Sequence, residues 1–294
     1  MVRAMRLAVP TLLLLAACGP THGGGDDDVT TPIDARASDA RTTDGTPGPD
    51  ASEELPSRVY AHSGTTLYVV DTATLTPTRI GDFTNLGTQS MLDIAVDRDE
   101  HMIGVTRDKI FQIDVATAAA TYLADFGAVR GFSSLSFVPA NPANPDGPEV
   151  LIAANDAGLV YRIDIAGASA TAVQVGSYGM QGATTIGSSG DIVSVRGFGT
   201  VATVNVGNGP DYLARLDPAN GWRATVIGTG TGYDNIFGLG FWGGKLYGFV
   251  DGGFEAGTGT IIVIDPQTGA VSQPRAGTVR WFGAGVTTIA PLIP

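Results

Sequence analysis

Few residues of this chain are of a type and spacing that could do chemistry, and most of these are carboxylates at the ends of apolar runs. Of the three histidines, His22 lies in a polar segment, while His62 and His101 lie in separate strand-like segments without a Ser or Cys nucleophile motif beside them. A catalytic triad is therefore not indicated. The His and Cys spacing does not fit a zinc site, and no EF-hand spacing occurs.

Seven charged or amide side chains at turn positions are the candidates for a ligand-binding site. They are Asp93, Arg107, Asn155, Arg196, Asp234, Asp251 and Glu255. Mixed charges that converge on the mouth of a pocket make a reasonable binding site. We expect no metal or cofactor, but calcium stays open as an alternative, because it binds Asp, Asn and Glu oxygens. Its candidate ligands are Asp93, Asn155, Asp251 and Asp234.

Two Gly-rich stretches, residues 197–211 and 251–259, are the most distinctive loops. We expect them, together with the seven candidates, on one face of the domain, which carries the loops between the second and third strands of each repeat and between successive repeats. Long loops of this kind suggest recognition, although loop drift explains them equally well. Four aromatic residues would give the face a character suited to sugars or peptides, or would pack over the strands as caps. They are Tyr178, Phe198, Tyr233 and Phe254.

A repeated strand pattern in the sequence indicates the elements that position these side chains. Five segments share alternating apolar residues that end in Asp, and they begin at Leu67, Ile110, Val160, Leu213 and Ile261. Their aspartates lie 43, 50, 53 and 48 residues apart. This period is typical of four-stranded propeller blades with variable loops.

The aspartates themselves are predicted to be structural. Turn residues follow them, as in Asp265-Pro-Gln-Thr-Gly269, so each carboxylate can accept backbone N–H groups of the turn. Paired strands precede each unit, such as those beginning at Asp93 and His101 or at Gly238 and Lys245.

The sequence thus predicts an all-β fold, a β-propeller of about five four-stranded blades over residues 57–294. The first unit starts one strand late, and residues 285–291 offer a spare strand, so a C-terminal strand should complete the N-terminal blade and leave no open edge. Six blades is the alternative if residues 196–211 hide further strands. The pattern resembles that of bacterial propeller lipoproteins with NHL-like or quinoprotein-like blades, and that resemblance assigns no ligand chemistry to a residue.

The N-terminus carries an export signal. Arg3 and Arg6 precede an apolar run that is too short to span a bilayer as a mature helix. The run ends in Leu15-Ala16-Ala17-Cys18, which resembles the lipobox of bacterial lipoproteins. The resemblance implies a signal peptide over residues 1–17, then diacylglycerol on Cys18 and often an acyl chain such as palmitate on its amino group. Gly19, not Asp, follows the cysteine, which favours the outer membrane, on either its periplasmic or its surface side.

Residues 18–56 are predicted to form a disordered tether, because they hold few large apolar side chains that could offset the entropy of ordering. Treated as a flexible coil, this tether reaches roughly 35 Å. The formal charge of −12 becomes −14 once Arg3 and Arg6 are removed, which argues against a nucleic-acid partner.

These features predict a membrane-anchored, monomeric binding module that presents propeller loops to a protein, peptide or glycan. Two alternatives remain: a calcium-dependent propeller hydrolase resembling lactonases, and a structural protein of the cell envelope. Fold alone does not choose among the three.

Overall fold

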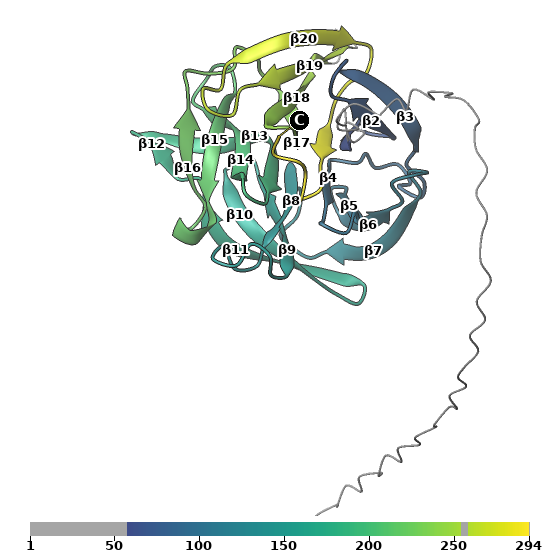
Figure 1. Cartoon of the computed structure of the whole chain (residues 1–294). Helices are drawn as coiled ribbons and strands as arrows, with labels where there is room; N and C mark the ends of the chain where they lie inside the picture. Colours follow the sequence, from purple (N-terminus) through teal and green to yellow (C-terminus); the bar gives the residue numbers. More distant parts are fainter. Residues whose placement is uncertain (1–57, 254–257, 294) are drawn as a thin grey trace, which may run out of the picture. The chain divides into compact units, whose positions relative to one another are not determined.

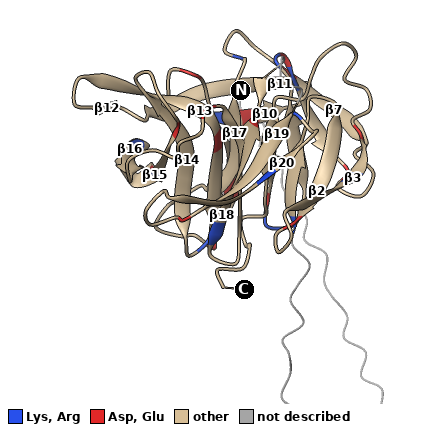
Figure 2. Ribbon diagram, turned by 90° about the horizontal axis from the view of Figure 1, so that it is seen from above, with Lys and Arg blue, Asp and Glu red and all other residues tan. Residues whose placement is uncertain are grey.

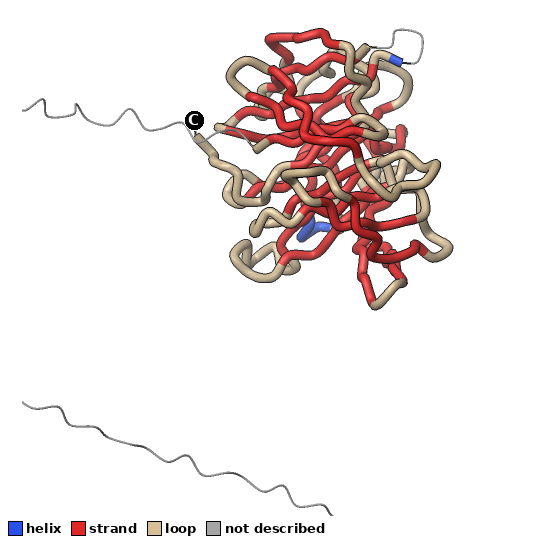
Figure 3. Tube along the Cα trace, turned by 90° about the vertical axis from the view of Figure 1, so that its right-hand side faces the viewer, coloured by secondary structure: helices blue, strands red, loops and turns tan. Residues whose placement is uncertain are grey.

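The computed structural model of the chain describes residues 58–253 and 258–293. Strands make up more than half of this part of the chain, and a 3₁₀ turn, η1 (Pro218–Asn220), follows one of them (Figure 3). The all-β prediction is therefore confirmed. The predicted signal peptide and tether, residues 1–56, lie outside the described residues.

The strands form four sheets, and each sheet is built from antiparallel meanders, in which successive strands pair. The first has the order β21-β1-β2-β3 and consists of β1 (Val59–His62), β2 (Thr66–Asp71), β3 (Thr76–Asp82) and β21 (Gly283–Gly285). The second contains two meanders: β4 (Asp93–Val96), β5 (Met102–Val105), β6 (Lys109–Ile113) and β7 (Ala120–Phe126), then β8 (Ser134–Pro139), β9 (Glu149–Ala154), β10 (Leu159–Ala166) and β11 (Ser169–Ser177). Its two halves join where the outermost strands β7 and β11 pair in parallel.

The remaining two sheets follow the same plan. One comprises β12 (Met180–Gln181), β13 (Thr184–Val195), β14 (Gly199–Val206), β15 (Tyr212–Asp217) and β16 (Arg223–Ile227). The other comprises β17 (Ile236–Trp242), β18 (Lys245–Asp251), β19 (Gly259–Ile264) and β20 (Val271–Gly277).

The five repeat segments are the third strands of these meanders, counted from the inside: β2, β6, β10, β15 and β19. The predicted Asp turns form at four of them. Asp71, Asp114 and Asp265 each accept the backbone N–H groups two and three residues on, and Asp217 accepts that of Ala219. Asp164 differs, because β10 continues past it and its carboxylate binds the guanidinium of Arg162 instead.

The C-terminal segment meets the N-terminal strand. Residues 283–285 pair with Tyr60–His62 in antiparallel fashion, so this strand overlaps the predicted segment, residues 285–291, at residue 285 alone. Beyond it, Thr287 forms a parallel bridge with Val96. The tail thus lies against both the first and the second meander.

The hydrophobic core lies between neighbouring meanders. One cluster joins Leu67 and Met91, the next joins Val105 and Leu135, and a third joins Ile152 and Ile192. The largest cluster contains buried side chains of β13, β17, β19 and β1 and includes Trp281. In Figure 1 the meanders follow one another around a centre, so that β17–β20 lie beside β1–β3.

One predicted loop is wrong. Most of residues 197–211 form the strand β14, whose Val201 and Val204 are fully buried. Residues 197 and 198 belong to the turn before it, and residues 207–211 form the loop after it. The alternation of Val and Thr in Gly199–Val206 was the signal for a strand, and the neighbouring glycines obscured it. This strand is the second of its meander and pairs with both β13 and β15.

Charge is distributed over the described domain rather than concentrated. Figure 2 shows Lys and Arg interspersed with Asp and Glu along the ribbon. Within residues 58–253 and 258–293, no helix has the length and apolar character needed to cross a bilayer.

Candidate functional site

The meanders have two ends, and the candidates divide between them. We call one end the crossover face; it carries the loops between second and third strands and between meanders, including residues 106–108, 155–158 and 228–235. We call the other the hairpin face; it carries the turns after first and third strands, including residues 97–101, 140–148, 196–198 and 218–222.

Five candidates lie at the crossover end of the domain, and the side chains of three of them make structural contacts there. Asn155 Oδ1 accepts the N–H of Leu159, and Asp234 Oδ1 accepts that of Asn235. Asp251 binds the guanidinium of Arg280 through both oxygens. Arg107 is exposed, and its carbonyl accepts the N–H of Gly131. Glu255, like Phe254, lies outside the described residues.

Asp93, the fifth, is not a surface residue at all. It opens β4 with no exposed area and lies beside Asp191 of β13, which is equally buried and which the sequence did not single out. Asp93 Oδ1 accepts the N–H of Ile94 at 2.9 Å. Asp191 accepts those of Ile192 at 2.6 Å and Leu239 at 2.8 Å.

The two carboxyls together bind the innermost strand of every meander. The N–H of Leu135 in β8 also stabilises the Asp93 carboxylate, and that of Ala284 in β21 stabilises Asp191. With β4, β13 and β17, this makes five strands. We call Asp93 and Asp191 the central acid pair.

Burial raises the pKa of both carboxyls, and the neighbouring Asp191 raises that of Asp93 further. Asp93 Oδ2 has no hydrogen-bond partner elsewhere in the described residues. Two adjacent buried carboxyls cannot both carry a negative charge. A single proton on Asp93, donated to Asp191, therefore satisfies both groups.

His62 borders this pair as a neutral imidazole. Its Nδ1 lies 2.9 Å from the carbonyl of Ser63, so Nδ1 carries the proton and Nε2 is a bare acceptor, 3.9 Å from Asp93 Oδ1. Burial lowers the pKa of His62 to about 4. Because no side-chain area of His62 or Asp93 is exposed, a substrate cannot reach them.

The calcium ligands expected on the crossover face do not converge. Among the described residues, the one group of three or more His, Asp or Glu side chains whose ligand atoms lie within 4.8 Å of one another is Asp97, Asp99 and His101. It lies on the hairpin face and includes none of Asp93, Asp234 and Asp251. Five backbone N–H groups directed at the central acid pair also disfavour a cation there, because their positive ends face the same point.

Arg196 was assigned to the wrong face. It forms the turn between β13 and β14, on the hairpin face, because the stretch after it is a strand rather than a loop. There its backbone N–H donates to Thr288, and its Nη1 lies 2.6 Å from Asp146 Oδ1.

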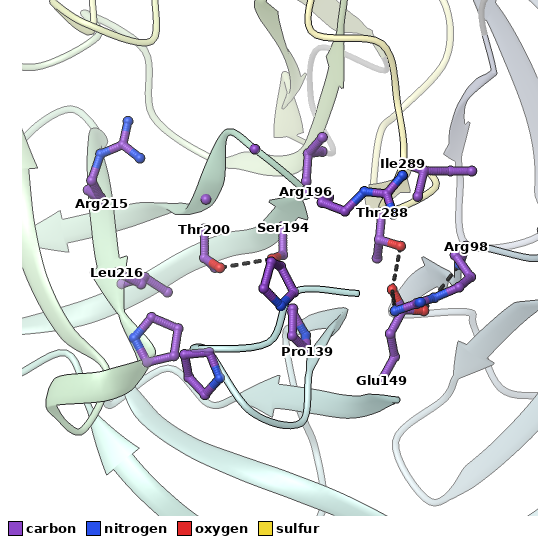
Figure 4. A pocket seen from close by; sticks show the side chains of 16 residues that line it. Arg98, Pro139, Glu149, Ser194, Arg196, Thr200, Arg215, Leu216, Thr288 and Ile289 are labelled. Atoms are coloured by element: carbon purple, nitrogen blue, oxygen red, sulfur yellow. Dashed lines mark hydrogen bonds and ion pairs between the residues drawn. The ribbon is translucent and has the colours of Figure 1, made fainter. Parts of the chain in front are cut away.

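Arg196 borders a pocket of about 200 Å³ (Figure 4). The pocket draws on the loops of two meanders, on the β4–β5 turn and on the C-terminal segment. Its apolar walls are Pro139, Pro142, Pro145, Val195, Leu216, Pro218 and Ile289. Its polar lining comes from Arg98, Glu149, Ser194, Arg196, Thr200, Arg215 and Thr288. We call it the arginine pocket.

Three interactions hold this pocket open. Arg98 binds the carbonyls of Asp146 and Gly147 and the carboxylate of Glu149, which fixes the β8–β9 loop. Thr288 donates to Glu149, so the tail is tied to the same point. Ser194 and Thr200 form a hydroxyl pair at 2.9 Å in the view of Figure 4.

Sequence reasoning found one member of this pocket, Arg196, and missed the others. Arg98 and Thr288 lie 190 positions apart, and no local pattern links them. The three aromatic candidates within the described residues are packing residues: Tyr178 is 1% exposed, the Phe198 ring lies 4.4 Å from that of Phe241, and Tyr233 packs against the same cluster as Phe198.

The chain is similar in structure to several solved proteins at low identity. One is a protein of unknown function from Bacteroides caccae, with 12% identity and a TM-score of 0.43, covering 78% of this chain and 98% of that one. Another is the β-propeller domain of Cps50 (Swd1) from Myceliophteria thermophila, with 12% identity and a TM-score of 0.38, covering 73% and 66%. A third is the Dos1 propeller, with 10% identity and a TM-score of 0.35, covering 79% and 66%. No protein-family model matches the chain, and no curated protein shows significant similarity to it.

Proposed function

We propose that this protein is an exported lipoprotein whose domain binds a ligand at the arginine pocket without transforming it. The observation that carries the proposal is the pocket itself. Proline side chains and buried polar groups form a preformed cavity, and the packing of the sheets does not require such a cavity. Preformed pockets lose little entropy on binding. Oligomerisation is not needed to complete the pocket.

The architecture that supports this function is a propeller of five four-stranded blades, with β21 as the innermost strand of the first blade. The pairing of β21 with β1 and the packing of the fifth meander on the first support it. Such a ring would hold the pocket loops rigidly with respect to one another.

The membrane anchor rests on the lipobox at Leu15–Cys18. Two or three acyl chains anchor a protein stably where one would not, at roughly 0.8 kcal/mol per buried methylene. We expect Cys18→Ser to abolish labelling with radioactive palmitate and to move the protein from the outer-membrane fraction to the soluble one. Labelling that persists in this variant would contradict the lipoprotein assignment.

The binding role is tested by filling the pocket. Ile289 lines it and is 45% exposed, so Ile289→Trp should occupy space without disturbing the core. Ile165→Trp, at a 41% exposed position of β10, is the matched control. We expect hits from a small-molecule library, detected by thermal shift with the wild type, to be lost with Ile289→Trp and retained with Ile165→Trp. Hits that survive in both variants would place the binding site elsewhere.

A further inference from the structure

The hydrogen-bonding capacity of the arginine pocket is unbalanced. Its carboxylate, Glu149, already accepts hydrogen bonds at both oxygens: one accepts from Thr288 and Arg98 Nη2, and the other accepts the backbone N–H of Arg98. The side-chain carboxylate of the pocket therefore has little left to offer a ligand that carries donors or positive charge.

The donors, by contrast, are in excess. Arg196 uses Nη1 for Asp146, and Arg215 uses Nη1 for the carbonyl of Phe198, whose ring its guanidinium also covers. The Nε and Nη2 groups of both arginines have no hydrogen-bond partner within the described part of the chain. In the Ser194–Thr200 pair one hydroxyl donates to the other, which leaves a second hydroxyl proton to donate. Ser194 and Thr200 are each 5% exposed, so that proton lies in a nearly dry site.

Unused guanidinium N–H groups and a buried hydroxyl proton favour a ligand that accepts hydrogen bonds and carries negative charge. Charge-assisted bonds from Arg to a carboxylate are about twice as strong as neutral ones. The composition of the pocket adds to this, because the chain as a whole is strongly acidic, whereas three arginines line the pocket.

The size of the pocket limits the rest of the ligand. A dry cavity of about 150 Å³ holds a benzene molecule, so about 200 Å³ accommodates a ring or a branched aliphatic group together with its carboxylate. Four prolines and three aliphatic residues surround that volume, which suits an apolar body.

We propose, on the basis of the binding function above, that the arginine pocket takes a small organic carboxylate with an apolar body the size of one side chain. Its carboxylate would lie against the guanidinium of Arg196, and its apolar body against the prolines. Two sources share this chemistry: a free acid and the C-terminal residue of a peptide.

The test is calorimetric titration of the full domain with phenylacetate and with phenylacetamide, which has the same shape but no charge. We expect phenylacetate to bind and phenylacetamide to bind at least tenfold more weakly. Arg196→Gln should weaken phenylacetate binding at least tenfold, whereas Arg162→Gln, an exposed arginine paired with Asp164 on β10, should leave it unchanged. Equal binding of the two probes, or an unchanged affinity in Arg196→Gln, overturns the carboxylate proposal.

A second pair of probes separates the sources. An acetylated tetrapeptide ending in leucine is compared with its C-terminal amide. Stronger binding of the free peptide acid than of phenylacetate supports a peptide C-terminus, and weaker binding supports a free acid; both outcomes require that the amide bind poorly. If no carboxylate binds but neutral library compounds bind and Ile289→Trp abolishes their binding, the ligand class is wrong and the binding function stands. If neither carboxylates nor library compounds bind at the pocket, both proposals are wrong.

Discussion

At the scale of single residues, the protonation states of buried side chains affect the stability of the domain. His62 is held neutral by burial beside Asp93, and Asp211 of the crossover face is buried as well, with a pKa raised to about 6. Burial thus disfavours the charged form of both groups. Their effects on stability against pH have opposite signs.

The His62 effect can be isolated. Its pKa is about 4 in the fold and about 6.5 in an unfolded chain. The unfolded state therefore binds more protons between these values, and His62 makes the fold less stable as pH falls from 6.5 to 4, by up to about 3 kcal/mol. We expect His62→Gln to remove this part of the pH dependence in urea unfolding. The exposed His101→Gln is the control, and equal slopes in the two variants would argue against the buried neutral imidazole.

Asp93 has the opposite linkage. Because its pKa is raised, the fold keeps a proton that the unfolded chain has lost, and stability declines as pH rises above about 4 toward the folded pKa. Asp93→Asn supplies a permanent N–H donor to Asp191 and does not titrate.

We therefore expect Asp93→Asn to match the wild type near pH 5 and to exceed it in urea midpoint at pH 9. Asp191→Asn should be destabilised at both pH values, because an amide nitrogen there would face N–H donors. A similar loss of stability in both variants would contradict the assignment of Asp93 as the proton donor and Asp191 as the charged acceptor of the central acid pair.

At the scale of elements, the innermost strands meet so closely at the centre that one position tolerates only glycine. A Cβ on Gly283 of β21 would lie 2.5 Å from His62 Nε2, and it would lie even closer to Asp93 Oδ1. Residue 283 must therefore be glycine, because β21 passes directly beside the central acid pair at this position.

Gly283→Ala is expected to destabilise the domain by more than about 2 kcal/mol, as overpacking of a buried site does. Gly277→Ala in β20 is the matched control, because a Cβ there meets nothing within 4 Å, and its effect should stay within about 0.5 kcal/mol. Chemical denaturation measures both. A tolerated Gly283→Ala would mean that β21 is not seated at the centre.

At the scale of the whole molecule, each hydrophobic cluster is shared between neighbouring meanders, so no meander has a core of its own. The domain should therefore unfold as one unit. Removal of residues 283–294 takes away β21 and the amide of Ala284.

We expect this truncation to lower the single melting transition by about 10 °C or more, since each kcal/mol shifts Tm by roughly 2–4 °C in a domain of this size. Calorimetry is the measurement. A second transition, or an unchanged Tm, would show that the tail is an independent addition.

Short-range features could be predicted from the sequence because short-range chemistry causes them. Alternating apolar residues specify strands, and an Asp followed by turn residues specifies a hairpin, as at Asp265. The apolar run before Cys18 predicts export in the same local way. The repeat period then indicates one sheet unit after another.

What only the tertiary structure decided was which side chains meet. Asp93 read as a loop carboxylate, yet it is buried because β13 brings Asp191 to it from 98 residues away. Arg196 was predicted on the crossover face. Because the glycine-rich stretch after it forms the strand β14, Arg196 instead lies on the hairpin face, beside Arg98 and Thr288. The reason is physical: strand propensity and turn chemistry act over a few residues, whereas the central acid pair and the arginine pocket form only where separate meanders pack.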